Sequence, residues 1–178
     1  MIQLPIIGCH AYVALAGLEI DGVTVSKDAK PDGEPEVNWK NLGVIEQAVS
    51  TPSYEGEATH YAPAPGGYKP RRSTFESAGL VIALTTQDMD ELIMALAMAA
   101  NQPDAGGNYV PGSLTEKQQA WLKVQKYRAD TDQLVNVFDM WSEVTVADVT
   151  DSRQVTKPVL NFRFLQSDLN VGQFSNLT

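Results

Sequence analysis

Only one stretch of this chain, residues 88–100, has the spacing of an amphipathic helix, and this restricts the fold more than any other feature of the sequence. Its apolar residues recur every three or four positions, as a single buried helix face requires. Asp88 and Glu91, three positions apart, form a pair typical of a helix N-terminus, and Pro103 follows the last apolar position. A chain with a single short helix must build its core from strands, so we expect a mainly β fold.

Most of the remaining sequence is typical of strands, since apolar or alternating runs are bounded by glycine and other turn residues. Residues 129–133 are expected to form a hairpin turn between two of these runs. We therefore predict a β-sandwich or barrel-like fold with one flanking helix, built as a single domain over residues 1–178. The expected strands are 10–17, 23–25, 37–47, 54–60, 73–85, 118–128, 134–146 and 159–166.

An irregular segment, residues 61–72, interrupts the strands and is predicted to be a long loop. Its three prolines and its Gly-Gly pair exclude a helix or a central strand. Lys69, Arg71 and Arg72 place three of the thirteen basic residues in this segment, on a chain whose net charge is −9. Two interpretations are open for this positive patch: a solvated loop, or a docking arm for an acidic partner surface such as another copy of the chain.

The sequence contains no recognisable catalytic or metal-binding constellation. The nucleophile elbow, the P-loop and the dinucleotide fingerprint are all missing. His10 and His60 lie in strand-like stretches and are interpreted as packing or surface residues, while the single cysteine, Cys9, is interpreted as a small buried thiol that leaves no internal disulfide. We therefore expect a protein that is not an enzyme and that needs neither a cofactor nor a metal ion.

The overall charge and the apolar runs exclude two further classes of function. A net charge of −9, with an isoelectric point near 4.6, argues against tight binding to nucleic acid. The longest apolar run, residues 92–100, is well short of the roughly 18 residues that a membrane-spanning helix needs. The N-terminus also lacks the features of a signal peptide, so we expect no membrane segment and no secretion.

The order of the elements resembles that of the major tail protein family of long-tailed bacteriophages. The resemblance begins at residues 39–44 (WKNLGV) and 53–57 (SYEGE), continues through the segment rich in proline, glycine and arginine, and reaches the strand at 73–84 and the TTQD at 85–88 before the helix. In that family, a Leu-Gly strand leads to an acidic strand, a long arm, a returning strand that ends in Leu-Thr, and one helix.

The resemblance implies a subunit that assembles into stacked, hexameric rings, which form the tube of a phage tail. DNA passes through such a tube without being tightly bound. The implied partners are further copies of the chain, a tape-measure protein and a tail terminator, and the implied location is the virion tail after synthesis in the host cytoplasm. Lys69, Arg71 and Arg72 are then candidates for the contact between rings.

Three glutamates are candidates for the wall of the channel. Glu55 and Glu57 fall on one face of the expected strand at 54–60, and Glu76 joins them from the strand that leaves the arm. Like charges opposed on a sheet are destabilising, so a fold tolerates them on a well-solvated face. A water-filled channel is one such face, and an ordinary outer surface is the other interpretation.

Two alternative functions are also compatible with the sequence. One is the tube protein of a contractile or secretion-type system that shares the fold. The other is a non-catalytic β-sandwich binding module, for instance for carbohydrate. Such a module displays exposed aromatic side chains, whereas Trp39, Trp121 and Trp141 lie inside strand patterns, which favours core packing.

Overall fold

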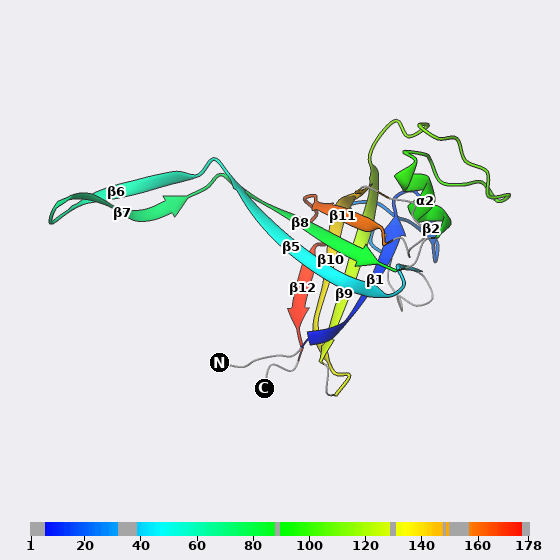
Figure 1. The fold of residues 1–178 in the computed structure, drawn as a ribbon, viewed down its shortest axis with the longest axis horizontal. Coiled ribbons are helices and arrows are strands. Elements are labelled where there is room, and N and C mark those ends of the chain that lie inside the picture. Colours follow the sequence, from blue (N-terminus) through cyan, green and yellow to red (C-terminus); the bar gives the residue numbers. More distant parts are fainter. Residues whose placement is uncertain are drawn as a thin grey trace.

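The computed structural model describes residues 6–31, 39–87, 90–128, 131–147, 149 and 157–175, with the backbone alone for residues 6 and 7. Its body is one eight-stranded antiparallel sheet, from which a two-stranded hairpin projects (Figure 1). The expected mainly β fold is confirmed, and the ladder of the described strands does not close into a barrel. The strands of the body are β1 (Ile6–Leu15), β4 (Lys40–Asn41), β5 (Ile45–Glu55), β8 (Ser77–Thr86), β9 (Gln118–Arg128), β10 (Leu134–Val146), β11 (Val159–Phe164) and β12 (Val171–Phe174).

The strand order is β4-β1-β9-β10-β11-β8-β5, with β12 paired to the first half of β10 and β11 to its second half. Strands β9 and β10 coincide with the expected strands at 118–128 and 134–146, and they form the expected hairpin. A second, very short hairpin joins β2 (Glu19–Ile20) to β3 (Val23–Thr24) through Asp21 and Gly22. Both of these turn residues have a positive φ, as a two-residue hairpin turn requires.

Both faces of the centre of the sheet are buried, because successive side chains of β1 and β9 enter two different clusters. The larger cluster contains aliphatic side chains of β1, β8, β9 and β11 together with those of the helix. The smaller cluster is aromatic and contains Tyr12, Trp39, Trp121 and Trp141. The three tryptophans are at most 4% exposed, so the prediction that they pack in the core is confirmed.

The single helix is shorter than the sequence predicts. Helix α2 spans Glu91–Ala97, and the side chain of Asp90 caps it by accepting a hydrogen bond of 2.9 Å from the Ile93 amide. Asp88, the predicted cap, lies outside the described residues. The helix ends before residue 100 because Ala99 has a φ of 49°, which leaves the helical region of backbone conformation.

The segment 61–72 is part of a β-hairpin and is not the predicted long loop. Strand β6 (Ala58–Ala64) pairs with β7 (Gly67–Thr74). The first residue pair of this ladder is Ala58 with Thr74, and the last is Ala64 with Gly67. The turn residues Pro65 and Gly66, the latter with a φ of 85°, suit a type II turn. Prolines are tolerated because each strand of a two-stranded ladder has a free edge, and proline is excluded only from central strands.

Two of the expected strands are interrupted. Within the expected strand at 37–47, of which 37 and 38 lie outside the described residues, β4 and β5 are separate strands. The expected strand at 54–60 breaks at Gly56, which has a φ of 68° and separates β5 from β6. A Cβ atom at residue 56 would lie 2.6 Å from the Glu76 Cγ. Glycine therefore suits this bend for two reasons: it adopts the positive φ readily, and it leaves room for the Glu76 side chain.

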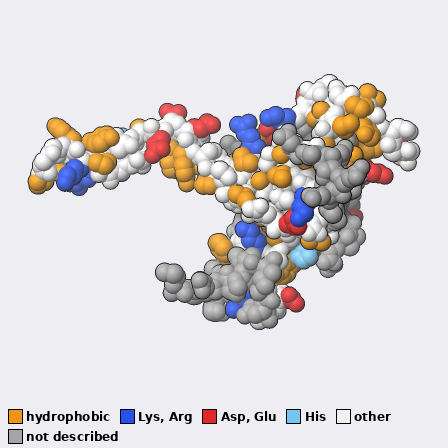
Figure 2. Space-filling view, in the orientation of Figure 1, with side chains coloured by type: hydrophobic (Ala, Val, Ile, Leu, Met, Phe, Trp, Pro, Cys, Tyr) orange, Lys and Arg blue, Asp and Glu red, His pale blue; other side chains and the backbone are white. Residues whose placement is uncertain are grey.

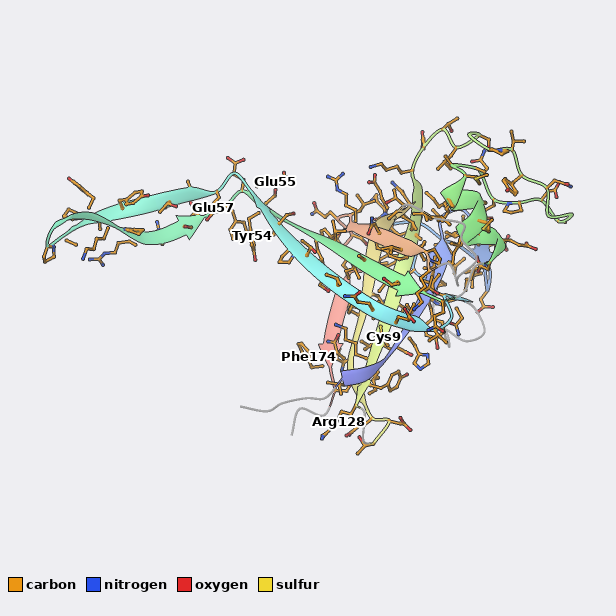
Figure 3. All side chains as sticks on the ribbon, viewed as in Figure 1. Cys9, Tyr54, Glu55, Glu57, Arg128 and Phe174 are labelled. Carbon is orange, nitrogen blue, oxygen red and sulfur yellow. The ribbon has the colours of Figure 1, made fainter. Side chains whose placement is uncertain are left out.

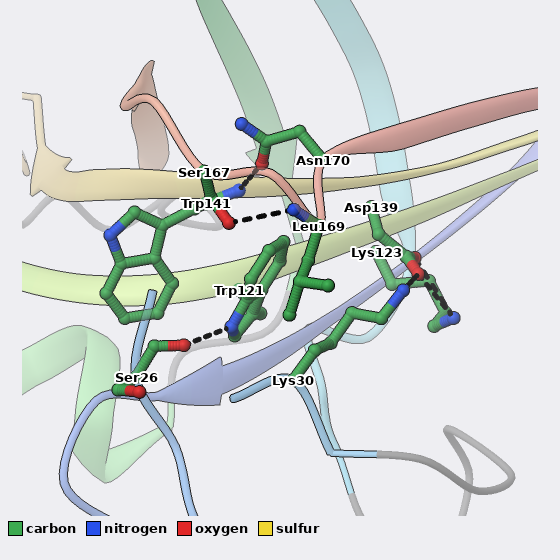
Figure 4. A network of polar contacts seen from close by, with 9 residues as sticks. All are labelled: Ser26, Lys30, Trp121, Lys123, Asp139, Trp141, Ser167, Leu169 and Asn170. Atoms are coloured by element: carbon green, nitrogen blue, oxygen red, sulfur yellow. Dashed lines mark hydrogen bonds and ion pairs between the residues drawn. The ribbon is translucent and has the colours of Figure 1, made fainter. Parts of the chain in front are cut away.

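A buried ion cluster ties the loop after β3 to the sheet. The Asp139 carboxylate on β10 is 7% exposed, and its Oδ2 accepts hydrogen bonds from Lys30 Nζ at 2.7 Å and from Lys123 Nζ at 3.2 Å (Figure 4). Its Oδ1 lies 3.0 Å from Lys123 Nζ without hydrogen-bond geometry, so that contact is ionic only. Close by, the Trp121 Nε1–H donates to the Ser26 carbonyl at 2.8 Å. These contacts fix the loop over the aromatic cluster.

Substituting Asp139→Asn is expected to lower the free energy of unfolding by about 2–3 kcal/mol, because two largely buried ammonium groups then lose their counter-charge. The expected loss of stability is smaller than that for breaking a fully buried ion pair, because both lysine side chains keep partial contact with water. Urea denaturation measures the change. The control is Asp28→Asn, which breaks an exposed pair with Lys27 and is expected to cost less than about 0.5 kcal/mol. Equal effects of the two substitutions would contradict a structural role for the buried cluster.

Candidate assembly interface

The feature with the clearest capacity for a function is an arm, residues 54–76, that extends away from the body (Figure 1). It consists of the hairpin β6–β7 and of an elbow, which comprises Tyr54 to Glu57 with Phe75 and Glu76. All of β7 and most of β6 are exposed, and the main packing partner of each strand is the other. An isolated two-stranded hairpin is at best marginally stable in water, so an arm of this kind needs a partner surface.

One face of the hairpin is apolar. Tyr61 is paired with Pro70 and Pro63 with Tyr68, and these two cross-strand pairs are two residues apart, so all four side chains share a face. The side chains of Tyr61 and Tyr68 are 62% and 75% exposed. Contiguous exposed apolar surface of this kind marks interaction sites in soluble proteins.

The predicted basic patch lies on the hairpin. Lys69 is paired with Ala62, and Arg72 with His60. Arg71 falls where the register shifts between His60 and Tyr61, so it occupies a β-bulge and has no residue opposite it. In the part of the chain that the structure describes, none of the three cations takes part in an ion pair. Their charges are therefore available to a partner.

The three candidate glutamates lie at the elbow. Glu55 ends β5, Glu57 follows the bend at Gly56, and the amide of Glu76 donates to the Glu55 carbonyl at 2.9 Å. Glu76 therefore lies beside Glu55 and Glu57, as expected. The prediction that Glu55 and Glu57 share one face of a continuous strand is wrong, because Gly56 interrupts that strand. Figure 3 shows Tyr54, Glu55 and Glu57 together at the bend.

The elbow also carries an exposed aromatic pair. The rings of Tyr54 and Phe75 are 4.9 Å apart and tilted, and the two side chains are 56% and 51% exposed. No pattern in the sequence pointed to these residues, nor to Tyr61 and Tyr68 on the hairpin. The cross-strand pairing that groups them is visible only once the segment is identified as a hairpin. The space-filling view shows acidic side chains near the bend, and apolar and basic ones toward the far end of the arm (Figure 2).

The two histidines have packing or surface contacts, as predicted, whereas Cys9, which was predicted to be buried, is only half-buried. His10 packs edge-on against Tyr127 with the ring centroids 5.3 Å apart, and His60 Nε2 shares a hydrogen bond of 2.9 Å with Thr74 Oγ1. Burial raises the pKa of the half-buried Cys9 thiol, although nearby Lys126 partly offsets this, and a raised pKa disfavours the reactive thiolate. Among the described residues, no three His, Cys, Asp or Glu side chains are placed to hold a metal ion.

A surface pocket of about 470 Å³ lies between β1, β2 and the start of α2. Its lining is largely aliphatic, with Trp39 and the charged residues Glu19, Lys40 and Glu91. Lys40 is engaged in an ion pair of 2.9 Å with Asp90. In the described part of the chain, no helix is both long enough and apolar enough to cross a membrane.

Comparison with known proteins gives a similarity in structure but none in sequence. No protein-family model matches the sequence, and no curated protein matches it either. Among solved structures, the chain is similar to a chain in the cryo-EM structure of the anti-feeding prophage (AFP) baseplate, 6-fold symmetrised. The similarity covers 99% of this chain and 97% of that chain, with 10% sequence identity and a TM-score of 0.45. At that identity and TM-score, the similarity establishes neither a common fold nor a common function.

Proposed function

We propose that this chain is a structural subunit of a phage tail, and specifically of its tail tube. Copies assemble into stacked, hexameric rings that enclose a path for DNA, and the chain catalyses no reaction. The observation that carries the proposal is the arm: an exposed hairpin with an apolar face and with three cations that make no ion pair among the described residues. The resemblance in the order of elements supplies the kind of assembly.

The main sheet offers a second surface for assembly. Strand β5 lies at one end of the ladder and is exposed along nearly its whole length. Its one hydrogen-bonded partner among the described strands is β8, so within the described residues its other edge has no strand partner for its backbone groups. Such an edge is a template for pairing with another chain. Pairing between neighbouring copies within a ring would protect it from uncontrolled aggregation.

The charge of the chain suits a conduit for DNA. A net charge of −9 repels phosphate at short range, since screening at physiological salt confines the repulsion to about 8 Å. DNA therefore moves past such a wall without adhering to it. The same proposal covers the tube of a contractile or secretion-type system and includes a tape-measure protein and a tail terminator as partners. The three tryptophans are buried and so cannot form the exposed aromatic surface of a carbohydrate-binding module; the exposed aromatic side chains of the arm are assigned in this proposal to assembly.

The purified protein is expected to self-associate into rings or tubes. Sedimentation velocity over a concentration series, with negative-stain electron microscopy of the same samples, measures this directly. The expected result is a concentration-dependent shift from monomers to rings or longer tubes. Strictly monomeric protein at every concentration, also after incubation with the other tail proteins, would overturn the proposal.

A further inference from the structure

The charges of the arm are separated along its length. Residues 58–75 contain three cations and no carboxylate, whereas the elbow contains three carboxylates and no cation. Within the described residues, no ion pair neutralises either set, and the elbow carboxylates make one side-chain hydrogen bond, a long one of 3.4 Å from Ser77 Oγ to Glu55 Oε2. The hairpin and the elbow are therefore equal in number of charges and opposite in sign.

The same two regions also match in their apolar surfaces. The hairpin presents Tyr61, Pro63, Tyr68 and Pro70 on one face, and the elbow presents the tilted pair of rings of Tyr54 and Phe75. Aromatic side chains stack favourably on one another and bury a large apolar area. On the hairpin, Lys69 and Arg72 alternate with the apolar residues and so lie on the opposite face of the ladder. Each region thus carries both exposed apolar and charged side chains, as protein–protein interfaces do.

The far end of the hairpin, which carries Tyr68 and Lys69, cannot meet the elbow of the same copy. Paired strands of seven residues span roughly 20 Å, and the register of the β6–β7 ladder holds the far end of the hairpin away from the elbow. Complementary surfaces that the pairing of β6 with β7 holds apart can meet only between molecules. A second copy of this chain is a partner that carries both surfaces.

We propose that the hairpin of one copy docks on the elbow of the next, with Tyr61 and Tyr68 against Tyr54 and Phe75, and with Lys69, Arg71 and Arg72 facing Glu55, Glu57 and Glu76. This inference rests on the proposed function, because it names the surfaces through which the copies assemble. The contact is head-to-tail, so it leaves a free hairpin and a free elbow in every dimer. Such a contact either closes into a ring or continues as a filament.

Charge reversal in two separate variants tests the docking. In the hairpin variant, Arg71→Glu and Arg72→Glu oppose an acidic hairpin to an acidic elbow; in the elbow variant, Glu55→Lys and Glu57→Lys oppose a basic elbow to a basic hairpin. Each variant alone is expected to remain monomeric while melting like the wild type. An equimolar mixture is expected to assemble, because the acidic hairpin of one variant meets the basic elbow of the other. Sedimentation at low and high salt measures both results.

The outcomes separate this inference from the proposed function. If the elbow variant assembles alone as the wild type does, docking on the elbow is overturned, and a channel or outer-face position for the glutamates is favoured. If both variants stay monomeric and the mixture does too, the elbow is again not the receptor, although the tube proposal stands. A wild-type protein that never assembles overturns the tube proposal itself.

Disulfide trapping locates the contact independently of charge. In a Cys9→Ser background, copies with Tyr68→Cys are mixed with copies with Tyr54→Cys and oxidised mildly. A covalent dimer of the two variants is expected in high yield. The control pairs Tyr68→Cys with Val110→Cys, an exposed position outside the arm, and is expected to give only the background yield. Equal yields from both pairs would contradict the docking.

Discussion

A variant in which Asn-Gly replaces residues 56–76 is expected to fold as stably as the wild type and to form no rings or tubes. Glu55 and Ser77 are cross-strand partners at the end of the β5–β8 ladder, so a two-residue loop can join them directly. The residues removed pack mainly on one another, so the free energy of unfolding is expected to change by less than about 1 kcal/mol. Urea denaturation and sedimentation velocity measure the two quantities.

A shorter deletion, which keeps the elbow, tests the hairpin alone. Replacing residues 61–70 by Asn-Gly removes the apolar face of the hairpin but retains Tyr54, Phe75 and the three glutamates. It is also expected to prevent assembly, because the docking surface is lost. Tubes of normal length from the variant without the arm would show that assembly uses other surfaces, such as the edge of β5.

Substituting Trp121→Ala is expected to destabilise the monomer by about 3–5 kcal/mol, more than the loss of the buried carboxylate in Asp139→Asn. The side chain is completely buried, its ring lies 5.4 Å from that of its cross-strand partner Trp141, and its indole N–H donates to the Ser26 carbonyl. Removing the indole leaves a cavity between the sheet and the loop after β3. Thermal denaturation is expected to show a decrease of the midpoint on the order of 10 °C.

Two further substitutions separate the causes of that loss. Trp121→Phe retains much of the buried volume but not the hydrogen bond, so it is expected to lie between the wild type and Trp121→Ala. Tyr68→Ala removes an aromatic side chain that is 75% exposed, and it is expected to change stability by less than about 0.5 kcal/mol. A similar loss from Tyr68→Ala and from Trp121→Ala would contradict the assignment of Trp121 to the core.

The fold class and the strongest strands follow from local patterns in the sequence. Residues 118–128 and 134–146 are long apolar and alternating runs around a polar turn, and they form β9 and β10 with the expected bounds. The existence of one helix was also predictable, because its apolar spacing is local information. Its length was not, since α2 ends where the chain turns at Ala99 to hydrogen-bond with the segment that follows.

Charge clustering in the sequence was sufficient to find the charged residues of the candidate interface, but not their arrangement. Pro65 and Gly66 carried a turn signal that favoured a hairpin over a loop. The three prolines of the segment led to the prediction of a loop instead, although proline is excluded only from central strands. The exposed aromatic residues of the arm were missed because exposure is not a local property of a sequence.

Contacts between groups that are far apart in the chain depend on the tertiary fold and could not be predicted. Asp139 is buried because Lys30 and Lys123 come to it from 109 and 16 residues away, and no periodicity in the sequence encodes that encounter. The bend at Gly56 also depends on the tertiary fold, since the alternating sequence pattern continues through residue 56 whereas the extended backbone conformation ends there. Local patterns set the type of an element, but the free energy of burying and pairing distant groups sets where the element ends and which side chains remain exposed.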